Sequence, residues 1–407
     1  MNFDDTPEEA TWREHVRAYI GEHRDHLAIF GAGGRRGEDL AIARMSQATL
    51  YDGGFVGVTW PREYGGQGGT PMQESIVYQE MSRAGVSQLI GLIGIGMCGP
   101  TVIAHGSDDQ KRRYLTRLLR ADDIWCQLFS EPAAGSDLAG LRTRAVRDGD
   151  DWRINGQKVW TTQAHMADYG ILLTRTDPEQ PKHRGLTMFV VNMKAPGVTV
   201  RPLRQMSGHA DFNEVFFDDV VIPDSERLGP VDGGWTVALT TLMSERLSIG
   251  GAGTDVGAGI DSVLEHVRKH IGALSEDRQA LVRQEFGRQY VASMAIRYTG
   301  YRQLSALSQG RMPGPEASAG KLAGTEAARA VADLCVRLLG GDAVYASDLD
   351  GSRTWPDLQA TLPGLAIAGG TDQILRNILG ERVLGLPAEP RADKGITFNQ
   401  SIAGGRS

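Results

Sequence analysis

The fold is decided by two stretches, Gln127-Leu-Phe-Ser-Glu-Pro-Ala-Ala-Gly-Ser-Asp-Leu-Ala139 and Asn155-Gly-Gln-Lys-Val-Trp-Thr-Thr162. Asn155-Gly156 predicts a β-hairpin, because this dipeptide favours the tight turns that join antiparallel strands. Gly135-Ser136 predicts a small turn at which a phosphate can approach backbone N–H groups. Further strand-like runs are Gly170–Thr174, Leu186–Met193, Val198–Pro202 and Asn213–Pro223. Residues 123–232 are therefore expected to form a β domain.

Helical patterns flank this β segment on both sides. Thr6-Pro7-Glu8-Glu9 is a capping box with proline at the first helical position, and amphipathic periodicity recurs to about residue 120. Helices return after residue 232, and one of them is expected to end at Gly340-Gly341. The chain is therefore expected to be α+β and mainly helical. Its expected domains are an N-terminal helical domain at 1–122, a middle β domain at 123–232 and a C-terminal helical domain at 233–407.

Composition excludes several classes of protein. The chain has 407 residues and a formal net charge of −7, which argues against nucleic-acid binding. Cys98, Cys126 and Cys335 stand far apart without a CxxC pair, so we expect no disulfide framework and a reducing, cytoplasmic setting. The longest apolar stretch, Leu89–Ala104, is too short to span a bilayer and is expected to be a buried helix.

Dinucleotide and metal motifs are also absent from the sequence. Gly31–Gly37 and Gly251–Gly257 read GxGxxxG, one residue too long for the dinucleotide fingerprint, and neither follows a strand. His266 and His270 have helical spacing but lack the glutamate of HExxH, so we expect them to be solvated rather than to bind zinc. No metal site is expected.

The two opening stretches resemble the flavin-binding segments of acyl-CoA dehydrogenases, which read much like SEPxAGSDLA and NGQKxWxT. The resemblance continues in the family's order through Trp60–Gly69, Phe212–Pro223 and Ile374–Pro387, and so covers nearly the whole chain. It implies a helical N-terminal domain, a middle β-barrel domain and a C-terminal four-helix bundle. It also implies FAD as cofactor and α,β-desaturation of an acyl-CoA thioester, a reaction of lipid metabolism and β-oxidation.

The resemblance assigns the flavin to two neighbouring strand ends. An isoalloxazine needs a planar face to stack on and hydrogen-bond donors near N5 and its carbonyl edges, and Trp160 followed by two threonines can supply both. The residues implied to line FAD are Gln127, Phe129, Ser130, Gly135, Ser136, Trp160, Thr161 and Thr162. Ser136 is also implied to lie near the CoA.

Further FAD contacts are implied for Arg283, Arg337, Gly341, Thr371 and Gln373. Arg283 matches an arginine that reaches the FAD pyrophosphate of a neighbouring subunit, and Thr371 and Gln373 match positions near the adenine end. Arg337 departs from the family, which usually has glutamine there. Contacts of this kind across subunits imply at least a dimer.

The family reaction needs a carboxylate to remove the α-proton of the thioester while the β-hydrogen leaves as hydride to flavin N5. Many members place this glutamate in a Tyr-Glu-Gly-Thr stretch, where this chain reads Ala368-Gly369-Gly370-Thr371. Glycine has no side chain that could accept a proton. The N–H of Gly369 is still implied to polarise the substrate carbonyl, and Gly370 is implied to contact the substrate.

Other members, the isovaleryl and long-chain enzymes among them, carry the base on a helix in which glutamate precedes arginine. Glu245-Arg246 stands at the matching place in this chain. The resemblance therefore implies that Glu245 is the catalytic base and that Arg246 supports both Glu245 and the substrate. A structural salt bridge is the alternative for Glu245, because Glu-Arg is a common dipeptide. Asp372 is a weaker alternative base, since it replaces a residue that usually points away.

Three functions remain open on the sequence. The first is an active acyl-CoA dehydrogenase, similar to bacterial members that act on fatty acids or steroid side chains. The second is a non-catalytic partner subunit of a heteromeric acyl-CoA dehydrogenase. Gly369 and Arg337 favour this function, because both depart from the residues usual in the family. The third is an oxidase or flavin monooxygenase of the same fold. The family implies electron-transferring flavoprotein as electron acceptor and a homotetramer or an α2β2 heterotetramer.

Overall fold

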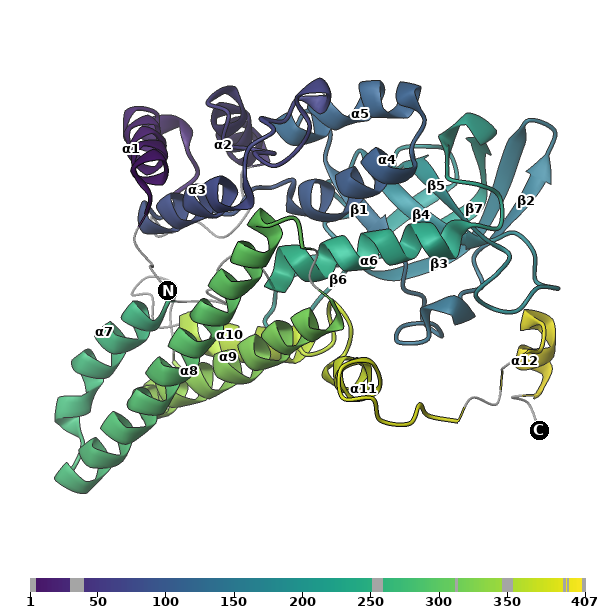
Figure 1. Cartoon of the computed structure of the whole chain (residues 1–407). Coiled ribbons are helices and arrows are strands. Elements are labelled where there is room, and N and C mark those ends of the chain that lie inside the picture. Colours follow the sequence, from purple (N-terminus) through teal and green to yellow (C-terminus); the bar gives the residue numbers. More distant parts are fainter. Residues whose placement is uncertain are drawn as a thin grey trace.

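Helices, a sheet and further helices follow one another along the chain, as expected from the sequence (Figure 1). The computed structural model describes residues 5–29, 40–250, 259–311, 314–345, 354–390, 393 and 395–404. The two GxGxxxG stretches, 31–37 and 251–257, lie outside the described residues. In the described part no helix combines the length and apolar character needed to cross a membrane.

The N-terminal helices form where the capping signals predict them. They are α1 (Pro7–Glu22), α2 (Leu40–Asp52), α3 (Pro71–Arg83), α4 (Gly99–His105) and α5 (Asp108–Arg120). Thr6, Thr70 and Ser107 each close a capping box, in which the side chain accepts from the third helical N–H and the residue at that position bonds back. Most of the long apolar stretch forms the expected buried helix, with a π-helical turn at Gly94–Cys98 leading into α4.

The middle of the chain is one eight-stranded sheet in the order β6-β7-β3-β2-β4-β5-β8, with β1 paired to β4. Its strands are β1 (Trp125–Leu128), β2 (Arg144–Asp148), β3 (Asp151–Thr162), β4 (Tyr169–Arg175), β5 (Leu186–Asn192), β6 (Val198–Leu203), β7 (Phe212–Pro223) and β8 (Arg227–Leu228). The long strands β3 and β7 pair antiparallel along most of their length. Apolar side chains lie on both faces, so one core joins the sheet to the helices and a second fills its other side.

The predicted hairpin at Asn155-Gly156 was wrong. Strand β3 runs straight through this dipeptide, and the chain turns earlier, at Gly149, between β2 and β3. Instead, the register between β3 and β7 shifts between Ile154 and Gly156, which marks a β-bulge. A Cβ at Gly156 would lie 2.4 Å from the Thr143 hydroxyl, so glycine is needed here for close approach rather than for a turn.

The C-terminal part is helical again. Its helices are α6 (Gly234–Gly250), α7 (Ile260–His270), α8 (Glu276–Ser308), α9 (Ser318–Leu339), α10 (Thr354–Leu365), α11 (Asp372–Arg382) and α12 (Phe398–Gly404). Helices α7, α8, α9 and α10 pack into a bundle, whereas α6 lies along the sheet and contacts β5, α4 and α9 (Figure 1). The short α12 lies apart from the bundle, beside the sheet (Figure 1).

The paired histidines on α7 are less exposed than expected. His266 is half-buried, with Nε2 3.0 Å from the carbonyl oxygen of Cys335, and His270 Nδ1 bonds to the carbonyl of His266. Burial lowers the pKa of His266. Both rings thus serve packing between α7 and α9. No group of His, Cys, Asp or Glu among the described residues is arranged to hold a metal.

Candidate functional site

A buried ion pair joins the two stretches that the sequence singled out. Lys158 on β3 is fully buried, and its Nζ lies 2.9 Å from Glu131 Oε1 and 2.9 Å from the carbonyl oxygen of Phe129. One residue further along, the N–H of Val159 donates to the carbonyl of Ser130 at 2.9 Å. The chain leaving β1 is therefore fixed against the end of β3.

Glu131 also organises the chain beyond the turn. Its carboxylate accepts the backbone N–H groups of Arg142 at 2.6 Å and Thr143 at 2.8 Å. Burial alone would raise the pKa of Glu131, but the Lys158 charge and these hydrogen bonds hold it below its ordinary value. The carboxylate therefore stays ionised in a buried place because every contact to it is a donor.

Trp160 is held in an unusual conformation at the end of β3. Its φ is +60°, a left-handed value that is rare for a bulky residue, and its indole is 61% exposed with only its edge against Phe212. The register between β3 and β7 shifts between Lys158 and Thr161, which turns the indole outward. Backbone strain of this kind persists where the surrounding contacts fix it, often at functional sites.

Beside this indole lies an unsatisfied polar group. The hydroxyl of Thr161 is buried, and the described residues supply it with no hydrogen-bond partner. Its carbonyl, by contrast, accepts from Asn213 Nδ2 at 2.9 Å. An exposed flat aromatic face next to an orphaned hydroxyl fits a ligand that is itself flat and carries polar edges.

The chain after β1 makes a hydrogen-bonded turn and then an exposed stretch at 135–136, called the tip below. Glu131 and Ala134 exchange backbone hydrogen bonds, each at 3.0 Å, so the tight turn lies directly before Gly135-Ser136, where the sequence predicted it. A Cβ at Gly135 would meet nothing within 4 Å, and Ser136 is exposed. Asp137 is tied down by Lys182 Nζ at 2.8 Å. The tip at 135–136 is thus a small exposed backbone surface between two anchored ends.

Glu245 lies near the end of α6, half-buried. One turn before it, the fully buried Thr241 shares a 2.8 Å hydrogen bond with Thr101 on α4, and His105 Nε2 bonds to Thr240 at 2.8 Å. Residues four apart lie on one face of a helix, so Glu245 shares the face of Thr241. That face packs on α4 and the π-helical turn at 94–98. The side chain of Arg246 lies outside the described part of the structure.

The loop before α11 is built around two left-handed glycines. Gly369 has φ +66° and Gly370 has φ +90°, values that side chains rarely adopt. Lys321 on α9 holds this loop, with Nζ 3.1 Å from the Gly370 carbonyl and 2.8 Å from Asp372 Oδ1. Thr371 caps α11 by accepting the N–H of Ile374 at 3.1 Å. Asp372 is buried in this ion pair, in line with the expectation that its position points away.

The remaining residues expected at the cofactor lie elsewhere in this chain. Arg283, near the start of α8, donates to Gln279, and Arg337, near the end of α9, is ion-paired with Glu285. These helix ends lie at the end of the bundle that is far from the sheet (Figure 1). Gly341 follows directly after α9. A single chain therefore does not bring these three residues to Trp160.

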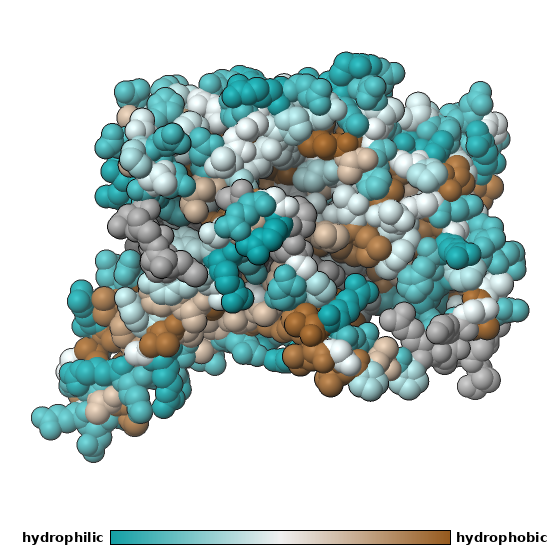
Figure 2. Space-filling view, viewed as in Figure 1, coloured by the Kyte–Doolittle hydropathy of each residue, from teal (hydrophilic) through white to brown (hydrophobic). Residues whose placement is uncertain are grey.

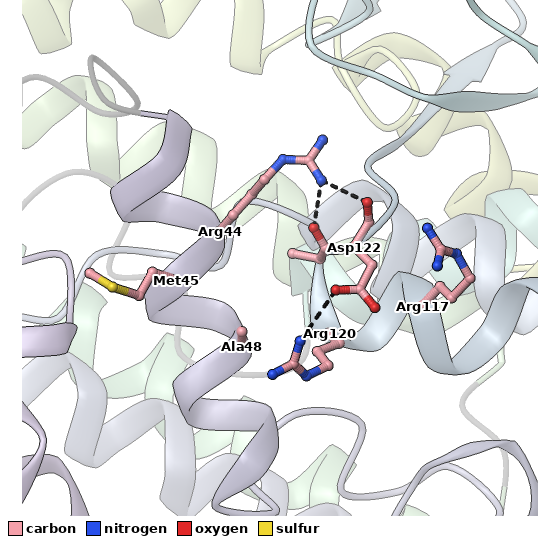
Figure 3. Close-up of a pocket in the computed structure, with 7 residues that line it drawn as sticks. Arg44, Met45, Ala48, Arg117, Arg120 and Asp122 are labelled. Carbon is pink, nitrogen blue, oxygen red and sulfur yellow. Dashed lines mark hydrogen bonds and ion pairs between the residues drawn. The ribbon is translucent and has the colours of Figure 1, made fainter.

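A shallow hollow of about 570 Å³ lies between α2 and the end of α5 (Figure 3). It is lined by Arg44, Met45, Ala48, Arg117, Arg120, Ala121 and Asp122. Arg44 donates to two backbone carbonyls at 2.7 Å. Arg117 pairs with Asp123. Arg120 pairs with Asp52. The arginines of this hollow are thus engaged in holding α2, α5 and the following loop together.

Models of three protein domains match the chain in order. They are described as the acyl-CoA dehydrogenase N-terminal domain, matching residues 6–122, the middle domain, matching 126–220, and the C-terminal domain, matching 232–384. The chain belongs to the acyl-CoA dehydrogenase family. This acyl-CoA dehydrogenase is accordingly an FAD-dependent oxidoreductase, and the three-domain fold inferred from the sequence is confirmed.

Relatives of this chain include proteins of Mycobacterium tuberculosis. The chain is 34% identical to acyl-CoA dehydrogenase IpdE1 of Mycobacterium tuberculosis, covering 93% of this chain and 98% of that protein. It is 38% identical to FadE34 of the same organism over 84% of this chain, but spans only 46% of that relative. Among solved structures, the steroid ACAD Tcur3481-Tcur3483 matches with TM-score 0.80 at 29% identity, covering 96% of this chain and 100% of that one.

A second solved structure is the ChsE4-ChsE5 complex from Mycobacterium tuberculosis. It matches with TM-score 0.79 at 31% identity, covering 96% of this chain and 100% of that chain. Both of these structures are named as pairs of different proteins.

Sequence reasoning missed the two ion pairs that support the site. Lys158 and Glu131 both lie inside the quoted motifs. Lys158 shares a strand face with buried apolar residues, and this could have indicated a buried lysine that needs a partner. The pair of Lys321 with Asp372 left no such signal, because its partners are 51 positions apart in the sequence.

We expect Lys158→Met to destabilise the protein by about 3–5 kcal/mol, because it leaves the Glu131 carboxylate buried without a countercharge. Urea unfolding measures this, and the flavin content should fall as the strand ends separate. The exposed Lys269→Met is the matched control and should change stability by no more than ~0.5 kcal/mol. Equal stabilities of the two variants would contradict the role assigned to the pair.

The same pair predicts a pH dependence. The folded-state pKa of Glu131 lies below its ordinary value of 4.5, so in acid the unfolded chain binds the proton more readily. The stability from Glu131 is complete above the unfolded pKa and is lost as the pH falls through the folded value. We expect the difference in unfolding free energy between wild type and Glu131→Gln to shrink as the pH falls below about 4.5. A difference that stays constant would show that Glu131 is not ionised in the fold.

Proposed function

We propose that this chain desaturates an acyl-CoA thioester between Cα and Cβ, with Glu245 as the base that removes the α-proton. When bound, FAD supplies the acceptor for the β-hydride. Two observations together carry the proposal. Position 369 is a left-handed glycine, which has no carboxylate. Glu245 has a carboxylate and shares the buried face of α6 that packs on α4 and the π-helical turn. A half-buried carboxylate there can take a proton from a substrate lying along that turn.

The flavin would be held at the end of β3. Trp160 offers its exposed indole as a stacking face, and Thr161 and Thr162 follow as donors to the ring's polar edge. Phe129 and Ser130 flank the same place because Lys158 and Val159 fix them there. Gln127, on β1, enters the site from the neighbouring strand.

The diphosphate and the CoA would meet the exposed turn at Gly135 and Ser136. The substrate carbonyl would accept the N–H of Gly369, with Gly370 beside it, and Lys321 and Asp372 would keep this loop in place. Arg246 directly follows the base and would support it and the substrate. A fixed donor matters here because the α-proton is acidic only while the thioester oxygen is polarised.

The active form would be an oligomer. Arg283, Arg337, Gly341, Thr371 and Gln373 would complete the FAD site of a neighbouring subunit. The first three belong to the start of α8 and the end of α9, and these helix ends lie far from the sheet (Figure 1). Apolar side chains also gather on the surface over α11 and the segment after it (Figure 2). They include Ile367, Val383, Leu384 and Leu386. Such a patch suits a subunit interface of a homotetramer or an α2β2 heterotetramer.

Electron-transferring flavoprotein is the proposed acceptor of the electrons, and the cytoplasm the proposed compartment. The three cysteines of the chain are all buried and unpaired, which suits a reducing environment. Burial raises the pKa of Cys335 to about 12, so its thiol stays protonated and unreactive.

We expect Glu245→Gln to slow reduction of the bound flavin by acyl-CoA about 10²–10⁴-fold, because the amide cannot take the α-proton. Anaerobic stopped-flow bleaching of the yellow enzyme, across a panel of acyl-CoA thioesters, measures this. Glu265→Gln, an exposed glutamate on α7, is the control and should leave the rate unchanged. Full reduction rates in Glu245→Gln would remove Glu245 as the base.

A non-catalytic partner subunit is the second candidate, favoured by the glycine at 369 and by the likeness to the ChsE4-ChsE5 complex. Flavin reduction in the assembled protein decides between the two, whether the chain assembles alone or with a second chain. The first proposal expects reduction by acyl-CoA that is lost in Glu245→Gln. A complex with a second chain in which Glu245→Gln leaves flavin reduction unchanged would instead support the partner role. Rapid reoxidation by O₂ would point to an oxidase.

A further inference from the structure

The C-terminal segment, here residues 393 and 395–404, lies away from the helical bundle and docks on the middle domain (Figure 1). The backbone N–H of Phe398 donates to the carbonyl of Gln180 at 2.9 Å, and the N–H of Asn399 donates to that of Pro178 at 3.2 Å. Phe398 is only 5% exposed. The segment is thus anchored to the loop between β4 and β5. The C-terminal domain match ends at residue 384, so this segment lies beyond it.

Phe398 covers a buried cation that has no carboxylate directly bonded to it in the described part of the chain. The guanidinium of Arg175 lies 3.7 Å from the centre of the Phe398 ring, close enough for a cation–π contact. Arg175 donates to the carbonyls of Ala139 at 2.6 Å and Leu141 at 3.2 Å, and to Lys182 at 3.1 Å. Burial lowers the pKa of Arg175 to about 10. This side chain therefore joins the segment after the exposed turn to the β4–β5 loop.

A second cation links the same three parts. Lys182 Nζ lies 2.8 and 2.9 Å from the two carboxylate oxygens of Asp137, the residue after Ser136. It also pairs with Asp393 from the C-terminal segment. The exposed turn, the β4–β5 loop and the C-terminal segment therefore meet at Arg175 and Lys182.

We propose that the C-terminal segment is a positioning element of the acyl-CoA site. Phe398 and Asp393 hold Arg175 and Lys182, and these two cations hold residues 137–141, directly after the tip of the turn at 135–136. The inference rests on the proposed function, in which this turn meets the CoA. A turn that is ordered before its ligand arrives loses less conformational entropy on binding, so the segment raises affinity without touching the reacting atoms.

The test compares point variants of the flavin-loaded protein. Phe398→Ala removes the ring, Phe398→Tyr keeps an aromatic face over Arg175, and Asp393→Asn removes the charge on Lys182. Val146→Ala is the matched control, because it removes an exposed apolar side chain on β2, outside the docked segment. Calorimetric titration with coenzyme A gives Kd. Hydrogen exchange of residues 135–141 in the unliganded protein, measured by mass spectrometry, reports the order of the turn.

We expect Phe398→Ala to raise Kd roughly three- to tenfold and to speed exchange at 135–141 by a similar factor, the size expected for loss of one cation–π contact. Asp393→Asn should act in the same direction, whereas Phe398→Tyr and Val146→Ala should match wild type. Unchanged Kd in Phe398→Ala overturns the inference, even if exchange becomes faster. Wild-type protein that fails to bind coenzyme A at all overturns both this inference and the proposed function.

Discussion

The buried pair of Lys158 and Glu131 is the constraint on which the rest of the site depends. Two strands that do not pair with each other, β1 and β3, must end side by side to form the surface proposed to face the flavin. Main-chain pairing alone cannot do this, because β1 bonds to β4. The ion pair joins the two ends, and backbone groups make the other hydrogen bonds of both side chains.

The strain at Trp160 follows from this constraint. Lys158 and Thr161, three positions apart, are both buried, and the register shift between them leaves Trp160 in a left-handed conformation with its indole outward. Such a conformation costs on the order of 1–3 kcal/mol, which the surrounding hydrogen bonds must offset. The site is thus stable in its binding geometry before a ligand arrives.

Local signals in the sequence predicted the elements whose stability is local. The capping boxes at Thr6 and Ser107 sit at helix starts, and the strand runs lie within a residue or two of the observed strands. The prediction of a hairpin at Asn155-Gly156 was wrong. Glycine is needed at this position because Thr143 approaches it closely, and not because the chain turns there. Family resemblance supplied the candidate site residues, whereas the contacts that hold them, such as Lys321 with Asp372, join distant parts of the chain and left no local pattern.

The backbone at Gly369 has a consequence for how such enzymes can diverge. With φ at +66°, any residue other than glycine there would cost about 1–2 kcal/mol before its side chain did anything. A glutamate introduced at this position by one substitution would therefore destabilise the fold unless the loop also changed shape. The backbone of this loop thus favours enzymes that carry their base on another element, as proposed here for α6.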